Sequence, residues 1–539
     1  MKSHRLVLLA CLLLFCSCKK DALVTVPRQA QQVNALQTAG KTATVGPLLD
    51  TLAPANAVSV KKYSAAGDGT HDDTNALQAA INSETVLVLP AGTYIINNTL
   101  SMRSGIKIYG AGGAVIKAGN SLKGTLLSRG MYFNIENADN SLITNIKFQK
   151  STQPFKLGDW SNTCILIFNS RNNTVSYNNF DFNLPYAVSG LAAVWVSGSL
   201  SSNNIIKSNK MQSVGIEYAE NGANTTLADG NYISHAPGDG LSAHGNSDTY
   251  CSKNVVINNV VENSGLMGIE DWGKVDGTLI SNNTITGVGK DPSQGNSIGI
   301  SAVGINSRVV HNIISDAIGY YIESGGDNTI DSNVINDSQF KAIGIIGNFT
   351  ADNAIKQSLY TINKMKITGN IITGCTSSIV IYGNYNPYAD ITGNTMTNPA
   401  VIGINVDTSS PTYVMNIADN KISFTVPNQQ IRKGFESHNS FSHSDGQHIN
   451  LNNNSISYAG TATGGPGLEY GFEIGTDNVV VNGNYFYCNN IKGAKLPVVA
   501  ITGNTDPAYN LTVTNNLVYG GTVNFNDFTI KARSGNNFD

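Results

Sequence analysis

A short hydrophobic unit recurs along most of the chain. It consists of Ile or Val, two variable residues, Asn, one variable residue and then Ile, Val or Phe. Its Asn residues are Asn179, Asn209, Asn231, Asn259, Asn283, Asn312, Asn333, Asn370, Asn394, Asn420, Asn454, Asn484 and Asn516. These spacings, roughly 21 to 37 residues, are typical of repeat proteins with one coil per repeat and loops of variable length.

The repeat predicts a solenoid of short parallel strands. Stacked coils bury a continuous core of Ile, Val and Leu, and each strand pairs with the strand of the next coil. Asn tolerates a left-handed backbone better than most residues, and its side chain can bond to the Asn of the next coil. We therefore expect these Asn residues to occupy an equivalent, left-handed turn position in every coil.

Residues 56–118 have a pattern of their own. Gly67 and Gly69 allow a tight turn, and Asp72 or Asp73 is placed to cap a helix. The apolar face of that helix is Leu77, Ala80 and Ile81, and a strand at 86–89 and a turn at 90–94 follow it.

This segment resembles the N-terminal signature of the pectate-lyase superfamily. The resemblance is carried by the run GDGTHDDTNALQAAI at 67–81 and by the PAGTY at 90–94. It implies an all-β chain folded as a single-stranded right-handed parallel β-helix, the pectin-lyase-like solenoid, with an N-terminal capping helix. In that family the segment is structural, so we assign Asp72 and Asp73 no catalytic role.

Composition narrows the classes of partner. Only 13% of the 539 residues are charged and the formal net charge is −3, so no basic surface for nucleic acid is indicated. No glycine pattern of a nucleotide-binding loop occurs, and no nucleotide cofactor is expected. Cys164, Cys251, Cys375 and Cys488 lack the spacing of a zinc site and are expected to be buried packing residues.

The first residues predict export. Residues 1–18 combine a basic start with an apolar run too short to span a bilayer, which is typical of a signal peptide. The run FCSCKKD at 15–21 resembles a bacterial lipobox, which would make Cys18 the lipidated residue. We expect a flexible tether at 19–55 and the β-helix at 56–539. The expected location is the outer membrane, on the cell surface or in the periplasm, with only the lipid in the membrane.

The solenoid would bring a set of carboxylates onto one outer face. Five strands share Gly or Tyr, an apolar residue and then a Glu: Glu217, Glu270, Glu323, Glu436 and Glu473. Strand alternation buries the apolar residue and turns the Glu outward. The same column is expected to hold Trp195, Ser242 and Ser301, and the neighbouring outward column to hold His244 and Trp272.

This spacing suits glycoside hydrolysis. Coils stack at about 4.8 Å, so residues in alternate coils lie about 9.6 Å apart. Inverting hydrolases use two carboxyl groups about 6.5–9.5 Å apart. We therefore take Glu217, Glu270 and Glu323 as candidate acid and base, with Glu270 favoured. His244, between Glu217 and Glu270, is placed to bond either carboxylate and fix its protonation.

Aromatic and further acidic residues would complete the face. Trp272 and Trp195 offer flat rings to sugars, and Asp239 and Asp271 are nearby carboxylates. Strict alternation would bury Asp271, so we expect the strand to bend there.

Three alternatives stay open. A polysaccharide lyase would act by β-elimination on a uronate, with a base such as Lys274, Arg308 or Lys341 and, in some lyases, bound Ca²⁺. Hydrolysis is favoured because carboxylates outnumber matched bases. A non-catalytic surface glycan-binding protein would use the aromatic residues, with the Glu column serving only solubility. A uronate epimerase is the third alternative.

Two loops complete the candidates. Segment 153–162 supplies Trp160 as a further substrate-binding residue. Segment 429–448 holds His438, His443 and His448, whose spacing matches no standard metal site, so a solvated loop is expected. We assign no metal site, with Ca²⁺ left open for the lyase alternative, and predict a polysaccharide as the partner.

Overall fold

The computed structural model describes residues 52–538. The description leaves out 123–129, 151–161, 187–190, 246–248, 292, 294–296, 326, 337–340, 347–362, 384–386, 409–411, 426–431, 439–445, 459–468, 489–497, 504–507, 521 and 526–527. The signal peptide with Cys18, nearly all of the tether, and Trp160 therefore lie outside the described residues. No helix among the described residues is long and apolar enough to cross a membrane.

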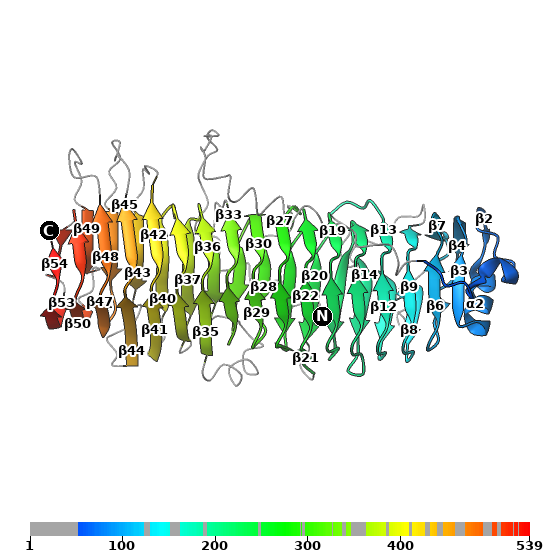
Figure 1. Cartoon of the computed structure of the whole chain (residues 1–539), viewed down its shortest axis with the longest axis horizontal. Coiled ribbons are helices and arrows are strands. Elements are labelled where there is room, and N and C mark those ends of the chain that lie inside the picture. Colours follow the sequence, from blue (N-terminus) through cyan, green and yellow to red (C-terminus); the bar gives the residue numbers. More distant parts are fainter. Residues whose placement is uncertain are drawn as a thin grey trace.

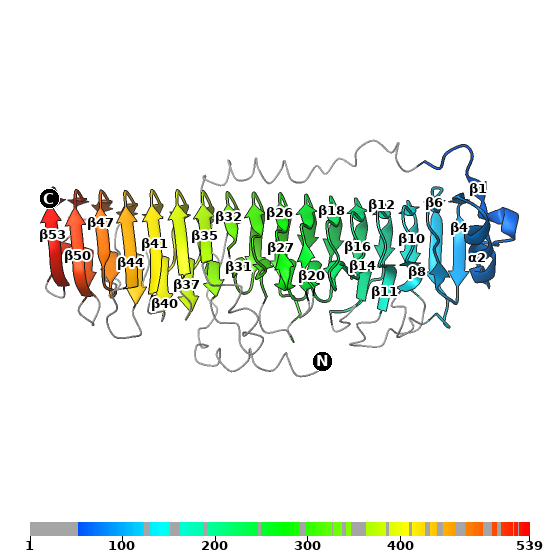
Figure 2. The same cartoon turned by 90° about the horizontal axis from the view of Figure 1, so that it is seen from below.

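The chain is a right-handed parallel β-helix, as the repeat and the family resemblance together predicted. Strands stack in chain order along one long axis, from α2 at one end to β54 at the other (Figure 1). Seen from below, the coils repeat with the same outline along the whole array (Figure 2).

Three parallel sheets form the walls. We call them A, B and C, and in each the pairing follows chain order. Sheet A contains β1 (Val58–Ser59), β3 (Val86–Leu89), β6 (Lys107–Gly110), β9 (Leu142–Thr144), β12 (Thr174–Ser176), β15 (Ile205–Lys207), β18 (Leu227–Asp229), β22 (Val255–Ile257), β26 (Leu279–Ser281), β29 (Arg308–Val310), β32 (Thr329–Asp331), β35 (Asn363–Thr368), β38 (Pro387–Thr392), β41 (Thr412–Ala418), β44 (Gly446–Asn452), β47 (Val479–Asn482), β50 (Ala508–Thr514) and β53 (Phe528–Ser534).

Sheet B follows sheet A after a tight turn in each coil. It contains β2 (Asp68–Asp72), β4 (Gly92–Ile96), β7 (Ala114–Ala118), β10 (Lys147–Gln149), β13 (Asn179–Asp181), β16 (Lys210–Gln212), β19 (Tyr232–Ser234), β23 (Val260–Glu262), β27 (Thr284–Val288), β30 (Ile313–Ala317), β33 (Val334–Asn336), β36 (Ile371–Thr373), β39 (Thr395–Thr397), β42 (Lys421–Phe424), β45 (Ser455–Tyr458), β48 (Tyr485–Cys488), β51 (Leu517–Tyr519) and β54 (Asn537–Phe538).

Sheet C carries the column of glutamates. It contains β5 (Leu100–Ser101), β8 (Gly130–Glu136), β11 (Asn162–Phe168), β14 (Leu191–Ser197), β17 (Gly215–Glu220), β20 (Leu241–Gly245), β24 (Ile269–Gly273), β28 (Ile300–Ala302), β31 (Ile322–Ser324), β34 (Lys341–Ile346), β37 (Ser377–Gly383), β40 (Ile402–Thr408), β43 (Arg432–His438), β46 (Glu469–Ile474), β49 (Val498–Gly503) and β52 (Thr522–Val523). A separate short pair is formed by β21 (Cys251–Ser252) and β25 (Val275–Asp276).

The predicted helix closes one end of the array. It is α2 (Thr74–Ser83), preceded by the short helix η2 (Val60–Tyr63), and it buries Leu77, Ala80 and Ile81 as expected. Asp72 Oδ1 accepts from the backbone N–H of Thr74 at 3.0 Å. Asp73 is buried and its carboxylate accepts from the N–H groups of Ala66 and Gly67. Asp72 therefore holds the first residue of α2, whereas Asp73 is the N-cap residue by position and its carboxylate fastens the preceding turn.

The predicted row of Asn side chains, each bonded to the Asn of the next coil, is present, with two corrections. We call this row the Asn ladder. Each ladder Asn donates from Nδ2 to the side-chain oxygen of the next, as in Asn231 to Asn259 at 2.9 Å and Asn259 to Asn283 at 3.0 Å. The first member is Asn178, not Asn179, because Asn178 is the residue that bonds to Asn209. The ladder also continues past Asn516 to Asn536.

The sequence prediction placed the left-handed residue of each turn one position too far along the chain. It is the residue before each ladder Asn, for example Asn258 at φ 57° and Asn282 at φ 56°. The ladder Asn itself turns inward, so its side chain lies buried between coils where its amide bonds to the neighbouring backbone. The prediction that the ladder Asn is left-handed was wrong.

The repeated glycines of sheet C are explained by coil stacking. A Cβ on Gly240 would lie 2.6 Å from the carbonyl oxygen of Gly268, and one on Gly434 would lie 2.8 Å from that of Gly471. Both contacts are too close for real side chains. The glycine before each apolar residue therefore lets successive coils approach.

Two further expectations have clear outcomes. The four described cysteines Cys164, Cys251, Cys375 and Cys488 are free and buried, which confirms their packing role. Segment 429–448 does not interrupt the array, because it supplies strands β43 and β44. His438 and His448 lie on these strands, in sheets C and A respectively, so the loop prediction was wrong for them.

Candidate active site on sheet C

The outward column predicted from the sequence exists. Register pairs join Trp195 to Glu217, Glu217 to Ser242, Ser242 to Glu270, Glu270 to Ser301, and Ser301 to Glu323. The three glutamates are each only 7% exposed although they sit on the outer side of the sheet. The column continues through Gly344, Val380 and Asn405 to Glu436 and Glu473.

His244 bridges two of these glutamates. Its Nδ1 lies 2.9 Å from Glu217 Oε1, and its Nε2 lies 3.0 Å from Glu270 Oε2. Burial lowers the pKa of His244, but the Glu217 and Glu270 carboxylates outweigh burial and raise that pKa well above its ordinary value. The imidazole is therefore a cation whose two N–H groups each donate to one carboxylate.

Glu217 is held from two sides. The hydroxyl of Ser242 donates to Glu217 Oε2 at 2.9 Å, beside the bonds from His244. Burial raises the pKa of Glu217, and the charge of His244 opposes that shift. Both oxygens of Glu217 are thus engaged within the protein.

Asp239 and Glu270 form a carboxyl pair. Asp239 precedes β20, accepts from the N–H of Met267 at 3.1 Å, and hydrogen-bonds to Glu270. Burial raises the pKa of Asp239 well above its ordinary value, and the Glu270 charge raises it further. Two carboxyl groups can share a hydrogen bond only if one carries the proton. His244 bonds to Glu270, which stabilises Glu270 as the anion, so we assign the shared proton to Asp239.

A bulge in β17 adds a residue that sequence reasoning missed. The register shifts between Glu217 and Ala219, so Glu220, not Ala219, pairs with His244. Glu220 therefore lies in the outward column of His244 and Trp272. No pattern in the sequence marks this bulge, since Tyr218 and Ala219 are both apolar enough to turn inward.

Glu220 binds Trp195. Trp195 Nε1 donates to Glu220 Oε2 at 3.1 Å, and Ser197 and Asn221 donate to the same oxygen at 2.9 Å. The Trp195 side chain is buried and packs against Leu166 and Ala192. Trp195 is therefore a buried packing residue whose ring face is not accessible to a sugar, and we assign it no sugar contact.

Asp271 is inside the solenoid. Strand β24 pairs with β20 without any register shift, so the predicted bend at Asp271 is wrong. The hydroxyl of buried Tyr218 donates to Asp271 Oδ1. Burial raises the pKa of Asp271 to about 6, and hydrogen bonds, above all from Tyr218, hold it from rising further. Asp271 cannot reach a substrate on the outer face.

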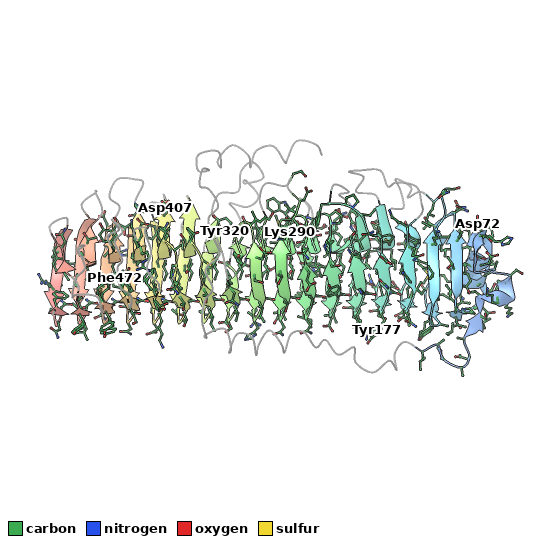
Figure 3. The ribbon with its side chains drawn as sticks, turned by 90° about the horizontal axis from the view of Figure 1, so that it is seen from above. Asp72, Tyr177, Lys290, Tyr320, Asp407 and Phe472 are labelled. Carbon is green, nitrogen blue, oxygen red and sulfur yellow. The ribbon has the colours of Figure 1, made fainter. Side chains whose placement is uncertain are left out.

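Glu323 lies two coils beyond Glu270. The hydroxyl of Ser301 donates to Glu323 Oε2 at 3.0 Å. Tyr320 is close by, since the Glu323 charge adds to burial in raising the pKa of the Tyr320 hydroxyl. Tyr320 lies on the same long edge of the array as Asp407, opposite Tyr177 (Figure 3).

The remaining candidates divide between the site and other parts of the molecule. Trp272 pairs with His244 and is half-buried beside Glu270. Lys274 is near, with its Nζ 5.5 Å from the centroid of the Tyr250 ring. Arg308 is exposed on β29 of sheet A, so the fold does not bring it to this face.

Three of these groups are close enough to bind a cation. The ligand atoms of Asp239, His244 and Glu270 all lie within 4.8 Å of one another. Their hydrogen bonds to one another already satisfy the charges, so a metal would have to displace the shared proton. The absence of a resident metal stays a prediction.

A known protein family matches the part of the chain that contains this site. Residues 57–290 match the family described as rhamnogalacturonase A/epimerase, pectate lyase-like. This part of the chain belongs to the pectate-lyase-like superfamily. The matched residues include the cap and the coils with Asp239, His244 and Glu270, and the same parallel β-helix continues beyond them without a break.

Other likenesses are more distant. A 65-residue stretch is 40% identical to the non-secreted LysM effector LysM19 of Penicillium expansum, and covers 11% of this chain and 5% of that protein. The catalytic domain of a GH87 α-1,3-glucanase in complex with tetrasaccharides shows 15% identity and a TM-score of 0.39, over 90% of this chain and 70% of that one. An exopolygalacturonase from Thermotoga maritima shows 13% identity and a TM-score of 0.43, over 68% and 93% of the two chains. Likenesses of this size carry no argument about activity.

Proposed function

We propose that the protein is a carbohydrate-active enzyme that hydrolyses glycosidic bonds on the outer face of sheet C. The observation that carries this proposal is the Asp239–Glu270 pair, in which one carboxyl group is kept protonated in a row of outward glutamates. The family description, which names a rhamnogalacturonase and an epimerase, supports a polysaccharide as substrate, and the neutral sugar preferred below departs from the uronate in that name.

Asp239 is the acid in this proposal. Cleavage of a glycosidic bond needs a proton on the leaving oxygen, and a carboxylic acid with a raised pKa supplies it at neutral pH. Glu270 keeps the proton on Asp239 by accepting its hydrogen bond, and His244 compensates the charge of Glu270. Once Asp239 has donated, the pair would hold two negative charges, which favours return of the proton from water.

Glu323 is the base. It stands two coils, about 9.6 Å along the stack, beyond Glu270, the residue to which the acid Asp239 is hydrogen-bonded. Inverting hydrolases hold acid and base about 6.5–9.5 Å apart, so the proposal requires the side chains of Asp239 and Glu323 to lean toward each other. Glu217 is equally spaced on the other side, but Ser242 and His244 occupy its oxygens. Glu217 is therefore assigned to positioning His244 rather than to acid or base.

Elimination on a uronate is less well supported. Arg308 lies on another sheet, and the Lys274 ammonium is placed over the Tyr250 ring. The face itself carries Glu217, Glu220, Glu270 and Glu323, which repel the carboxylates of a uronate chain. A Ca²⁺ requirement is accordingly not part of the proposal.

We further propose that the enzyme is exported and held at the outer membrane through Cys18. The support is the apolar run and the lipobox-like sequence at 15–21. Metabolic labelling with a fatty-acid analogue should mark the natural chain and leave a Cys18→Ala variant unmarked.

The test uses residues 19–539 incubated with neutral and uronate polysaccharides, with and without Ca²⁺. New reducing ends without unsaturated-uronate absorbance, unaffected by chelator, are the expected result, and proton NMR should show inversion at the new anomeric centre. Unsaturated products would establish a lyase. Full activity in both Glu270→Gln and Glu323→Gln would rule out the assigned residues.

A further inference from the structure

A second polar cluster lies farther along the same outward column. Glu436 and Glu473 occupy the column on adjacent strands β43 and β46. The Lys433 ammonium contacts both carboxylates, at 2.6 Å from Glu473 Oε2, and His438 Nε2 lies 2.6 Å from Glu436 Oε1. Glu436 is 4% exposed and the Lys433 side chain 17%. Keeping charges this well buried is costly unless they are paired.

The cluster repeats part of the layout of the active site, with Lys433 in the place of Asp239 and Glu436 in the place of Ser242. Asp239 and Lys433 each stand three residues before an outward residue, separated from it by a glycine and an apolar residue. Each also reaches the outward glutamate of the next coil, Glu270 for Asp239 and Glu473 for Lys433. Lysine therefore stands where the active site has its acid.

This exchange removes the means of catalysis. Burial raises the pKa of Glu436, but its bonds to His438 and Lys433 outweigh burial and leave that pKa below its ordinary value. A carboxylate in this state cannot donate a proton. The cluster can accept hydrogen bonds from hydroxyl groups but cannot protonate a leaving oxygen.

Neighbouring groups point to a ligand rather than to a closed ion-pair network. Asn405 precedes Glu436 in the column, and its buried side-chain oxygen accepts no hydrogen bond from the described residues. The Tyr470 ring is partly exposed, with Lys433 Nζ 5.9 Å from its centroid. Carboxylates, an amide and an aromatic ring together suit a sugar, which presents hydroxyl groups and an apolar face.

The charge of the cluster selects the sugar. Asp407 pairs in register with His438 and adds a third carboxylate to Glu436 and Glu473. Lys433 balances one of these charges and a protonated His438 a second, which leaves an excess of negative charge. A uronate would add a further negative charge, whereas a neutral sugar would not.

We propose that Lys433, Glu436, His438, Glu473, Asn405 and Tyr470 form a second, non-catalytic binding site for neutral sugar residues of a polysaccharide. The proposal rests on the proposed function, and it names a neutral glycan as the substrate class. Glu436 stands six coils beyond Glu270, about 29 Å along the stack. Val380, between them, is fully buried, so the two sites are separate contacts with one polymer.

The test measures binding apart from cleavage. Residues 19–539 with Glu270→Gln would be run in affinity gels containing soluble β-glucan, galactomannan, arabinoxylan or polygalacturonate. We expect retardation by at least one neutral polymer and none by polygalacturonate. Adding Glu436→Gln, or Tyr470→Leu in a separate variant, should weaken the retardation about tenfold.

Catalysis provides the second readout. With Glu270 intact, Glu436→Gln should leave turnover of the shortest cleavable oligosaccharide unchanged while raising KM for the polymer. Unchanged polymer affinity, or equal loss for polymer and oligosaccharide, would overturn the second site. Normal retardation without any product from any polysaccharide would instead overturn the proposed hydrolase and leave the binding site standing.

Discussion

Asp239 and Lys433 occupy equivalent places in their coils, and each reaches across to the outward glutamate of the next coil. One contact is a carboxyl pair that holds a proton, and the other is an ion pair that holds none. The exchange of Asp239 for Lys433 at this position of the repeat thus separates a carboxyl group that can donate a proton from an ammonium that forms ion pairs. By this relationship Glu473 is the counterpart of Glu270, and variants in the second cluster serve as controls for variants in the first.

Replacing Glu270 by Gln should nearly abolish cleavage. The amide cannot hold a negative charge beside His244 or keep the proton on Asp239. We expect the rate to fall by about 10²–10⁴-fold, the range for losing acid–base assistance. Reducing-end assays on the shortest cleavable substrate measure this, with Glu436→Gln as control at the natural rate. Equal effects of the two changes would contradict the assignment.

Replacing Asp239 by Asn should remove the alkaline limb of the pH–rate profile. In the natural protein Asp239 acts only while protonated, so activity should fall as pH rises through its raised pKa. Asn keeps a hydrogen bond to Glu270 but transfers no proton, so the residual rate should be low and flat on the alkaline side. An unchanged alkaline limb would assign that limb to another group.

Replacing Asp271 by Asn should change the pH dependence of stability. The folded pKa of about 6 exceeds the ordinary value of 3.8, so the folded state holds this proton more tightly. The free energy of unfolding therefore falls as pH rises from about 4 to 6, by roughly 3 kcal/mol in total. The amide of the Asp271→Asn variant cannot ionise, so this variant should show a higher urea midpoint than the natural chain at pH 8 and a similar one at pH 4.

Tyr218→Phe is the companion to that variant. Loss of the Tyr218 hydroxyl removes a bond that lowers the pKa of Asp271, so the decline with pH should extend to higher pH. If Tyr218→Phe and Asp271→Asn shifted the urea midpoint alike at every pH, ionisation of Asp271 would not be the cause.

The Asn ladder should be a large source of stability. Asn259 is fully buried, donates to Ala228 O and Asn283 Oδ1 at 3.0 Å, and accepts from Asn231 at 2.9 Å. Asn259→Ala would leave several of these buried groups without a hydrogen-bond partner, and each such group lowers the free energy of unfolding by about 1–3 kcal/mol. Asn450→Ala, which loses a bond to Asn416 on the partly exposed face of sheet A, should cost less than about 1 kcal/mol. If urea unfolding showed the same loss of unfolding free energy for Asn259→Ala and Asn450→Ala, a special role of the ladder would be refuted.

The sequence by itself determined the solenoid and the outward column. Its repeat of Asn and apolar residues has only one way to bury a core coil by coil, and strand alternation then places Glu217, Glu270 and Glu323 on one line. The tertiary structure decided what these groups can do. The bulge at Tyr218 places Glu220 beside His244. Asp239 bonds to Glu270 of the next coil, and Asp271 lies buried inside the solenoid. These contacts join residues more than 20 positions apart through side-chain packing between coils, and a repeat pattern carries no information about how neighbouring coils settle against each other.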